Sequence, residues 1–209
     1  MEKILFLALI AMILVSGCTS TQAPDGDNKA VGGEKIVYEK DGKLVVPDQI
    51  LPDNMKPGLQ WLMENTPEDS VVMSWWDYGH AIRSYAKREP VVDSPSREAL
   101  TTTVSKYLGK DPAEIECDTC VDNEMLREIA ELFLTENASR AAELMEKYNA
   151  QYLYVHVEDE EKSFAMNIIL GEEEIPENYL LGRFLAEETV EGFSLMYEDA
   201  VCRIYRFSA

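Results

Sequence analysis

The pattern of apolar and polar positions predicts short strands that alternate with helices. Leu59, Leu62 and Met63 share one face of a helix that would end before Pro67, and an apolar strand over Ser70–Ser74 follows. The further elements expected are a helix over Gly79–Lys87, a strand over Pro90–Asp93, a helix capped by Ser96, helices over Met125–Leu134 and Ser139–Tyr148, a strand over Gln151–Val157, a helix over Lys162–Leu170, and a terminal strand pair over Phe193–Tyr197 and Val201–Phe207. This alternation predicts an α/β layered domain with a central mixed sheet flanked by helices.

Residues 1–17 have the pattern of a signal peptide. Lys3 precedes an apolar run from Ile4 to Val15, which is shorter than the roughly 20 residues of a spanning helix. The letters VSGC, which end at Cys18, resemble a lipobox, after which a lipidated Cys18 becomes the new N-terminus. The alternative is an ordinary signal peptide with a chance cysteine. The lipoprotein interpretation predicts a chain anchored by lipid to the outer face of the cytoplasmic membrane.

The rest of the chain divides into a tether, a lead-in and a folded domain. Residues 18–34 are small, polar and rich in glycine, which predicts a lipidated N-terminus followed by a flexible tether. Residues 35–54 contain an alternating segment around Asp41-Gly42, which favours a small hairpin or a lead-in. The domain proper is expected over residues 55–209.

Composition and charge restrict the partners. The hydrophobic fraction of 46% with 28% charged residues is typical of a globular protein. A formal net charge of −20 argues against binding nucleic acid or an anionic lipid surface, because phosphates need Lys and Arg as partners. The acidic residues are scattered, so their ordinary role is to keep the surface soluble.

The most unusual stretch is WWDYG, which follows the first strand of the expected sheet. It supplies two indole N–H donors from Trp75 and Trp76, the carboxylate of Asp77 and the phenol of Tyr78. In an extended turn one Trp can pack inward while the other faces outward with Asp77. An indole N–H and a carboxylate that converge suit a small hydroxyl, which can donate to one and accept from the other. The alternative is that both indoles fill the core and Asp77 caps the helix that begins near Gly79.

WWDYG resembles the signature pentapeptide of the catalytic subunit of oligosaccharyltransferase. That membrane enzyme moves a glycan onto the Asn of Asn-X-Ser/Thr, and its Trp-Trp-Asp binds the hydroxyl of the Ser or Thr. The resemblance implies that role for Trp75, Trp76 and Asp77, with Tyr78 and Gly79 shaping the turn.

A second motif strengthens this resemblance. Archaeal members of the family carry Asp-X-X-Lys-X-X-X-Met or Ile on a helix beside the first motif, and residues 159–166, DEEKSFAM, match it. Lys162 and Met166 are four residues apart and share a helix face. Met166, or Ile169 one turn later, is then expected to cover the methyl group of a bound Thr. Taken alone, the segment could equally be an acidic helix start with core Met and Ile. The resemblance covers residues 55–207 and implies the fold of the family's soluble domain.

The resemblance extends to one half of the enzyme. The family's catalytic metal ligands and glycan-lipid site lie on membrane helices that precede this domain, and no apolar run after the signal could replace them. We therefore expect a domain that recognises acceptor peptides or exported polypeptides and is not catalytic alone, with no catalytic residue, metal or cofactor of its own. The alternatives are a subunit of a split or accessory complex with a multi-pass membrane glycosyltransferase, and an interaction domain that keeps the motif only for folding.

The remaining reactive residues have plainer interpretations. Cys117 and Cys120 can close a tight disulfide outside the cytoplasm, whereas Cys202 is expected to be a buried thiol. Asn137 begins the sequon NAS and is a candidate glycosylation site, although an Asn or Ser there is also an ordinary helix cap. Arg83 and Arg88 are expected to pair with nearby acids.

Overall fold

The computed structural model describes residues 38–40, 43–45, 53–104, 111, 117, 119–172 and 174–208. The predicted signal peptide, Cys18 and the tether lie outside the described residues. Strands β1 (Tyr38–Lys40) and β2 (Lys43–Val45) pair antiparallel within the range where a hairpin is expected.

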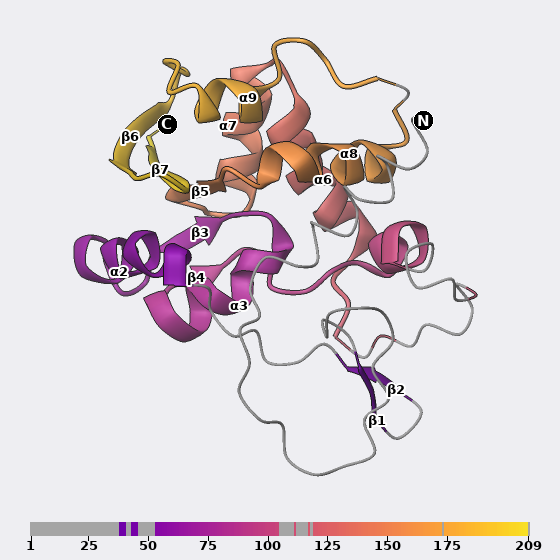
Figure 1. Ribbon diagram of the computed structural model, residues 1–209. Coiled ribbons are helices and arrows are strands. Elements are labelled where there is room, and N and C mark those ends of the chain that lie inside the picture. The colour runs from indigo at the N-terminus through magenta and orange to yellow at the C-terminus, as the bar shows by residue number, and fades with distance from the viewer. Residues whose placement is uncertain are drawn as a thin grey trace.

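A mixed five-stranded sheet forms the centre of the domain, with the strand order β4-β3-β5-β7-β6 (Figure 1). The first three strands are parallel to one another, and β7 pairs antiparallel with β5 and β6. The strands are β3 (Val71–Met73), β4 (Glu89–Pro90), β5 (Tyr152–His156), β6 (Phe193–Glu198) and β7 (Cys202–Phe207). All five residues of β5 are buried, because strands cover both of its edges and helices cover both of its faces.

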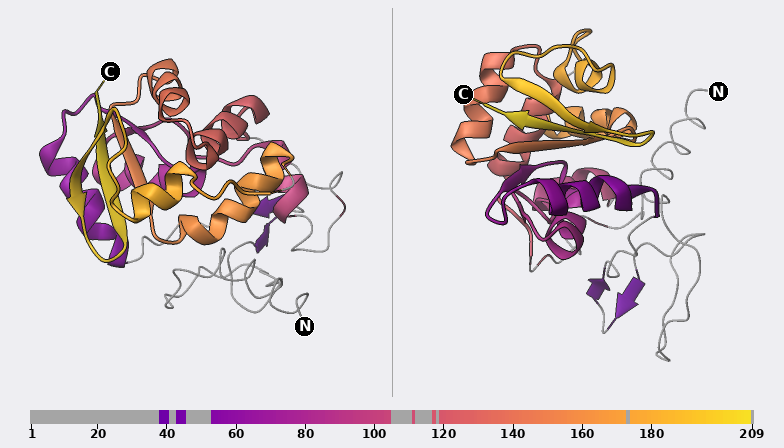
Figure 2. Two further views of the ribbon diagram at one scale, coloured as in Figure 1. Left: turned by 90° about the horizontal axis from the view of Figure 1, so that it is seen from above. Right: turned by 90° about the vertical axis from the view of Figure 1, so that its left-hand side faces the viewer.

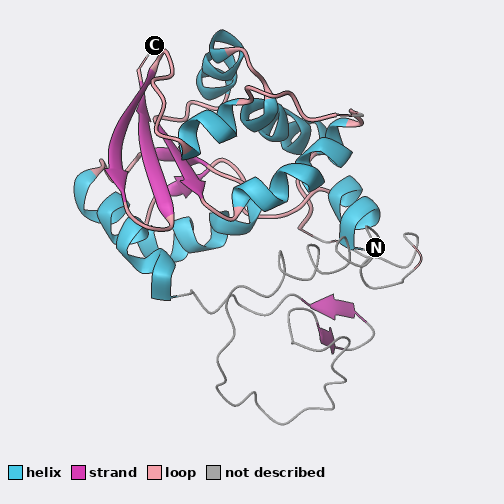
Figure 3. Cartoon of the chain, turned by 45° about the horizontal axis from the view of Figure 1, so that its top comes forward, coloured by secondary structure: helices cyan, strands magenta, loops and turns pink. Residues whose placement is uncertain are grey.

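Helices lie on both sides of this sheet, and the predicted α/β layered class is confirmed (Figures 2 and 3). On one side, α2 follows the short η1 and packs against η3, β6 and β7; on the other, α6 packs against α7, α8 and α9. Their bounds are η1 (Asp53–Met55), α2 (Lys56–Asn65), η2 (Trp76–Tyr78), α3 (Gly79–Ala81), η3 (Ile82–Ala86), α4 (Arg97–Ala99), η4 (Leu100–Val104), α6 (Asn123–Leu134), α7 (Ala138–Lys147), α8 (Asp159–Leu170) and α9 (Leu180–Leu185).

Side-chain caps explain why several predicted helices begin where they do. Ser96 Oγ accepts a hydrogen bond from Ala99 N at 3.1 Å and caps α4, as predicted. Asp122 caps α6 through Glu124 N at 2.7 Å. Each cap satisfies a backbone N–H group that has no partner within its own helix.

Several elements differ from the sequence prediction. The helix expected over Gly79–Lys87 is confirmed, but its second half is the π-helical η3 and it ends at Lys87, whose φ of 56° is left-handed. The strand expected over Pro90–Asp93 is wrong in its bounds, since β4 is Glu89–Pro90. Helix α9 was not predicted, because the segment that leads to it is dominated by acidic and polar residues.

Candidate functional site

The two motifs meet at one edge of the sheet. Strand β3 leads into the WWDYG segment, and β5 leads into α8, which carries Lys162. These strands are adjacent and parallel, so their carboxyl ends lie together, where open α/β sheets form binding crevices. Lys162 therefore reaches Asp77, although the two residues are 85 positions apart in the chain.

The WWDYG segment places one indole inside and the other nearer the surface. Trp75 is 3% exposed, whereas Trp76 and Asp77 are half-buried. The prediction of an extended turn here is wrong, because residues 76–78 form the 3-10 helix η2. Trp75 lies just before this turn with an extended backbone (φ −62°, ψ 148°), and its indole is buried while that of Trp76 is partly exposed.

Gly79 is required by a close approach of two backbone segments. A Cβ at this position would lie 2.0 Å from Val92 O and 2.4 Å from Asp93 Cα. Its φ of −58° is ordinary for any residue, so the constraint is steric and not conformational. The glycine of the motif thus lets η2 and α3 pack directly on the chain that follows β4.

Gly79→Ala is expected to lower the free energy of unfolding by about 2–3 kcal/mol, because backbone atoms must move to admit the methyl group. Chemical denaturation followed by tryptophan fluorescence would measure this change. Gly182→Ala is the matched control, since a Cβ there meets only the Tyr179 ring at 3.3 Å, which can rotate away. Equal effects of the two substitutions would contradict the steric explanation.

Lys162 is a buried ammonium that holds the motif carboxylate. Its side chain is 2% exposed, and its Nζ donates a hydrogen bond to Asp77 Oδ2 at 2.6 Å and another to Tyr78 Oη. The same Nζ lies 4.1 Å from the centre of the Tyr78 ring. Neither η2 nor α3 has a side-chain cap, so the alternative that Asp77 caps the following helix is wrong.

A second carboxylate, that of Asp159, completes the cluster. It is fully buried, and its Oδ1 lies 3.6 Å from Lys162 Nζ. Its Oδ2 accepts a hydrogen bond from the backbone N of His156 at 2.9 Å, which ties the first turn of α8 to the end of β5. Within the described part of the chain, Oδ1 of Asp77 is buried and accepts no hydrogen bond, whereas the Asp159 carboxyl also interacts with the Tyr78 hydroxyl.

Burial and mutual charge shift the pKa values of this cluster. Burial opposes the charged form of Lys162, but the carboxylates of Asp77 and Asp159 outweigh it and raise the pKa of Lys162. Burial raises the pKa of Asp159 to about 7, although the Lys162 charge opposes the shift. Burial and the Lys162 charge lower the pKa of His156 to about 4. Burial, with the nearby carboxylates, raises the pKa of Tyr78 well above its usual value.

His156 and Asp159 have opposite effects on stability over one pH range. A depressed pKa at His156 means that stability is lost as the pH falls from 6.5 to about 4. A raised pKa at Asp159 means that stability is lost as the pH rises from 3.8 to about 7. Between these limits the unfolded chain carries the proton on the imidazole and the folded chain carries it on the carboxyl. The two contributions therefore largely cancel.

Replacing either His156 or Asp159 should reveal the pH-dependent stability contribution of the other residue. As the pH falls from 7 to 4, the free energy of unfolding of His156→Gln is expected to rise by about 2–3 kcal/mol relative to that of the wild type. This value follows from about 1.36 kcal/mol for each unit of pKa shift. Asp159→Asn should lose a similar amount over the same range. Urea denaturation at a series of pH values measures both. Parallel pH curves for all three proteins would refute this compensation.

Met166 and Ile169 lie in the core. Their side chains are 0% and 1% exposed, so neither presents surface to a ligand in this structure. The prediction that one of them covers a Thr methyl group is untested, and it requires neighbouring side chains to move. Lys162, and not the apolar residues of α8, therefore connects α8 to the WWDYG segment.

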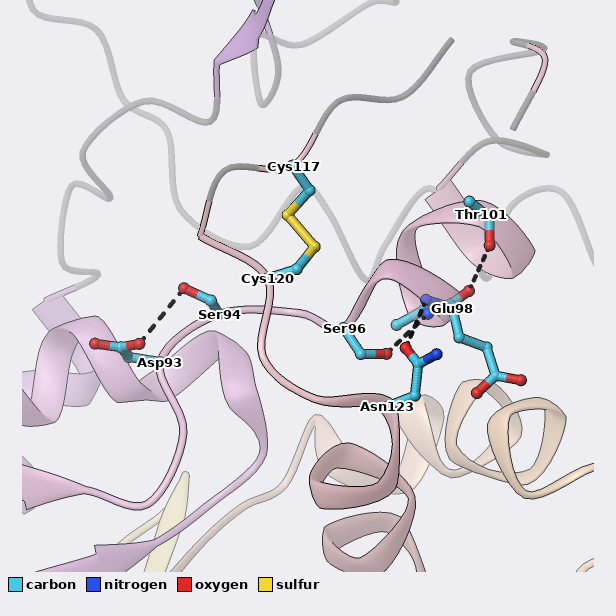
Figure 4. The surroundings of a disulfide bond; sticks show 9 residues. Asp93, Ser94, Ser96, Glu98, Thr101, Cys117, Cys120 and Asn123 are labelled. Carbon is cyan, nitrogen blue, oxygen red and sulfur yellow. Dashed lines mark hydrogen bonds between the residues drawn. A yellow bond between two sulfur atoms is a disulfide. The ribbon is translucent and has the colours of Figure 1, made fainter. Parts of the chain in front are cut away.

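The other candidate residues lie away from this cluster. Cys117 and Cys120 form a disulfide with Cα atoms 5.5 Å apart, beside the chain that carries Ser94 and Ser96 (Figure 4). Cys202 is a buried free thiol, as expected. Asn137 is exposed and caps α7, its Oδ1 accepting from Ser139 N at 3.0 Å, and its glycosylation stays a prediction.

Two residues of the cluster were not selected from the sequence. Asp159 begins the second motif and lies three positions before Lys162, on the same helix face, which was an available signal. His156 had no such signal, because only its strand pairing buries its ring against Tyr78, with ring centres 5.3 Å apart. Across the described ranges, no group of three or more His, Cys, Asp or Glu side chains could hold a metal ion. No helix in that part of the chain is long and apolar enough to cross a membrane.

Comparison with solved structures defines the class of this fold. The crystal structure of the C-terminal globular domain of oligosaccharyltransferase from Archaeoglobus fulgidus superposes with a TM-score of 0.54. The match covers 76% of this chain and 99% of that chain, at 19% sequence identity. The chain therefore has the fold of the C-terminal globular domain of oligosaccharyltransferase.

Curated relatives share short, more strongly similar segments. The dolichyl-diphosphooligosaccharide–protein glycosyltransferase subunit stt-3 of Caenorhabditis elegans is 47% identical over 47 residues, which cover 22% of this chain and 6% of the relative. The stt3 subunit of Schizosaccharomyces pombe is 48% identical over 58 residues, covering 27% and 8%. The dolichyl-phosphooligosaccharide-protein glycotransferase 2 of Pyrococcus furiosus is 34% identical over 68 residues, covering 32% and 9%. The chain spans less than a tenth of the length of each.

A family model also matches. The model described as HaoA-associated protein HaoB matches residues 30–166, which is more than half of the chain. The chain belongs to this family. The matched range contains WWDYG and ends at Met166, so it includes both motifs.

Proposed function

We propose that this domain recognises Ser- or Thr-containing acceptor segments of the Asn-X-Ser/Thr type and does not transfer glycans alone. Trp75, Trp76 and Asp77 would bind the side-chain hydroxyl, while Lys162, which also donates to Tyr78 Oη, holds the Asp77 carboxylate in place. The fold and the names of the curated relatives, which are protein glycosyltransferases, support this role. Met166 or Ile169 would contact the ligand only after local rearrangement.

The observation that carries this proposal is that only one of the two carboxylate oxygens of Asp77 has a hydrogen-bond partner among the described residues. Lys162 fixes its Oδ2 at 2.6 Å, whereas its Oδ1 is buried and has no hydrogen-bond partner among the described residues. An unsatisfied buried acceptor costs about 1–3 kcal/mol, so a retained one calls for a functional explanation. A hydroxyl that donates to Oδ1 would recover this cost, after neighbouring side chains move to open this buried atom.

The neighbouring indole supplies the complementary group. Trp76 is half-buried and adjacent to Asp77, and its N–H can only donate. An alcohol can donate to the carboxylate and accept from this indole at the same time. A carbonyl cannot donate and an ammonium cannot accept, so the pair favours a hydroxyl.

The isolated site should bind weakly. A hydrogen bond to a charged group contributes about 1.5–3 kcal/mol, two or three neutral contacts about 1 kcal/mol each, and one buried methyl about 0.8 kcal/mol. This gross gain is comparable with the cost of association, about 4–15 kcal/mol. We expect dissociation constants no tighter than about millimolar, so that a partner or a high local concentration is needed.

An NMR titration tests the proposal. Terminally blocked Asn-X-Thr peptide is expected to shift the Trp75, Trp76 and Asp77 resonances, and the matched Asn-X-Ala peptide is not. Trp76→Phe, which removes the indole N–H, should weaken the response several-fold. Trp61→Phe is the control, since Trp61 is another half-buried indole, on α2. Identical, negligible shifts with both peptides would reject peptide recognition and support the alternative that the motif serves only the fold. The burial of Met166 and Ile169 favours that alternative.

We further propose that lipid on Cys18 anchors the protein to the outer face of the cytoplasmic membrane. Tethering would raise the local concentration of the site near exported chains and near a multi-pass membrane glycosyltransferase, as a subunit of a split or accessory complex. The family's description as a HaoA-associated protein agrees with action beside a partner. Cys18→Ser should move the protein from the membrane fraction to the soluble fraction; unchanged membrane association would reject the anchor.

A further inference from the structure

A single buried cation serves two carboxylates at this site. Lys162 Nζ lies 2.6 Å from Asp77 Oδ2 and 3.6 Å from Asp159 Oδ1. The side chains of Lys162 and Asp159 are 2% and 0% exposed, so water screens neither of them from the other. Asp159 is also fixed in position, because its Oδ2 accepts from His156 N at 2.9 Å.

We propose that Asp159 is a positioning residue for the Asp77 carboxylate, acting through Lys162, so that binding of a hydroxyl-bearing peptide at Asp77 is linked to proton loss at Asp159. This inference rests on the proposed function and adds a form of regulation to the same site. Asp159 itself does not contact the ligand.

The argument depends on how the one positive charge is shared. When Asp159 is protonated, Lys162 neutralises Asp77 alone and the three groups carry no net charge. When Asp159 is ionised, one ammonium faces two carboxylates, the cluster carries a net charge of −1, and Lys162 is drawn toward both. Asp77 then keeps more of its negative charge and becomes a stronger acceptor for a hydroxyl. Because burial raises the pKa of Asp159 to about 7, both states are populated near neutral pH.

Asp159 is the member of the cluster that changes charge in this range. Its pKa is about 7, whereas His156, with a pKa of about 4, stays neutral. Tyr78 stays neutral and Lys162 stays charged because their pKa values are raised. The charged or titratable groups that face the cluster are Asp77 and Tyr78 from η2, Tyr154 and His156 from β5, Glu158 and Lys162 at the start of α8, and Asp199 between β6 and β7. Tyr154 stays neutral, because burial raises its pKa well above the usual value.

The test is the pH profile of peptide binding. Terminally blocked Asn-X-Thr peptide is titrated by NMR from about pH 5.5 to about pH 8.5, across the Asp159 transition. Wild-type affinity should rise about fivefold with pH, because the Asp77 carboxylate is a stronger acceptor once Lys162 also neutralises an ionised Asp159. Asp159→Asn should hold the low-pH affinity throughout.

Two control variants should keep the wild-type profile. They are Glu160→Gln, at an exposed neighbour in the same turn, and His80→Gln, at an exposed imidazole beside the motif. An Asp159→Asn profile equal to that of the wild type would overturn the inference.

A second readout needs no peptide. In the free protein, the carboxyl ¹³C resonance of Asp77 should show a step that follows the Asp159 titration and disappears in Asp159→Asn. If no peptide binds at any pH, the proposed function fails, yet this step would still establish that Asp159 controls Asp77. An Asp77 resonance that shows no such step overturns the inference whatever the peptide does.

Discussion

Lys162→Met is expected to lower the free energy of unfolding by about 3–5 kcal/mol at neutral pH, the usual cost of removing one partner from a buried ion pair. The substitution keeps most of the side-chain volume but leaves Asp77 and Asp159 facing each other without a counter-ion. It also removes the hydrogen bond to the Tyr78 phenol. Urea denaturation followed by tryptophan fluorescence measures the change.

A surface lysine provides the matched control for this prediction. Lys147→Met removes an ion pair of 2.5 Å with Glu128, but the Lys147 side chain is 49% exposed. Its loss should cost no more than about 1 kcal/mol. Adding Asp77→Asn and Asp159→Asn to Lys162→Met should recover part of the lost stability, because the unpaired charges are then gone. A full loss that persists in the triple variant would show that packing, and not charge, is the cause.

Arg88→Met is expected to lower the free energy of unfolding by about 3–4 kcal/mol, because hydrogen bonds from a charged donor contribute about 1.5–3 kcal/mol each and do not add fully. Arg88 is 5% exposed and was expected to pair with acids, which is wrong. Its guanidinium instead donates to Thr66 Oγ1 at 2.7 Å, to Met63 O and Thr66 O at 2.6 Å, to Lys87 O at 3.0 Å and to Ala86 O at 3.3 Å.

These acceptors lie at the ends of two helical segments. Met63 is in the last turn of α2, and Ala86 is the last residue of η3, so one cation satisfies carbonyl groups at both carboxyl ends. Arg88→Lys keeps the charge but not the forked geometry and should recover less than half of the loss. Arg83→Met is the surface control, since Arg83 pairs with Glu89 and Asp93, as expected, with 47% of its side chain exposed. Comparable losses for Arg83→Met and Arg88→Met would disprove this role of Arg88.

The sequence determined the local structure of this protein. The periodicity of Leu59 and Leu62, the caps at Ser96 and Asn137, and the apolar strand before Trp75 each depend on neighbours within a few positions. Such signals can be read without knowing the rest of the chain. The α/β class follows from their order, and WWDYG marked the place where the site would form.

The tertiary structure alone decided which groups meet there. The strand order brings the ends of β3 and β5 together, and this places Lys162 and Asp159 against Asp77. The same packing buries Met166, which a helix face could equally have exposed. It also brings Val92 so close to Gly79 that a methyl group does not fit. Hydrophobic periodicity determines which face of a helix or strand is buried. Which other elements that face packs against depends on long crossover connections, and no local sequence pattern specifies which strands those connections bring side by side.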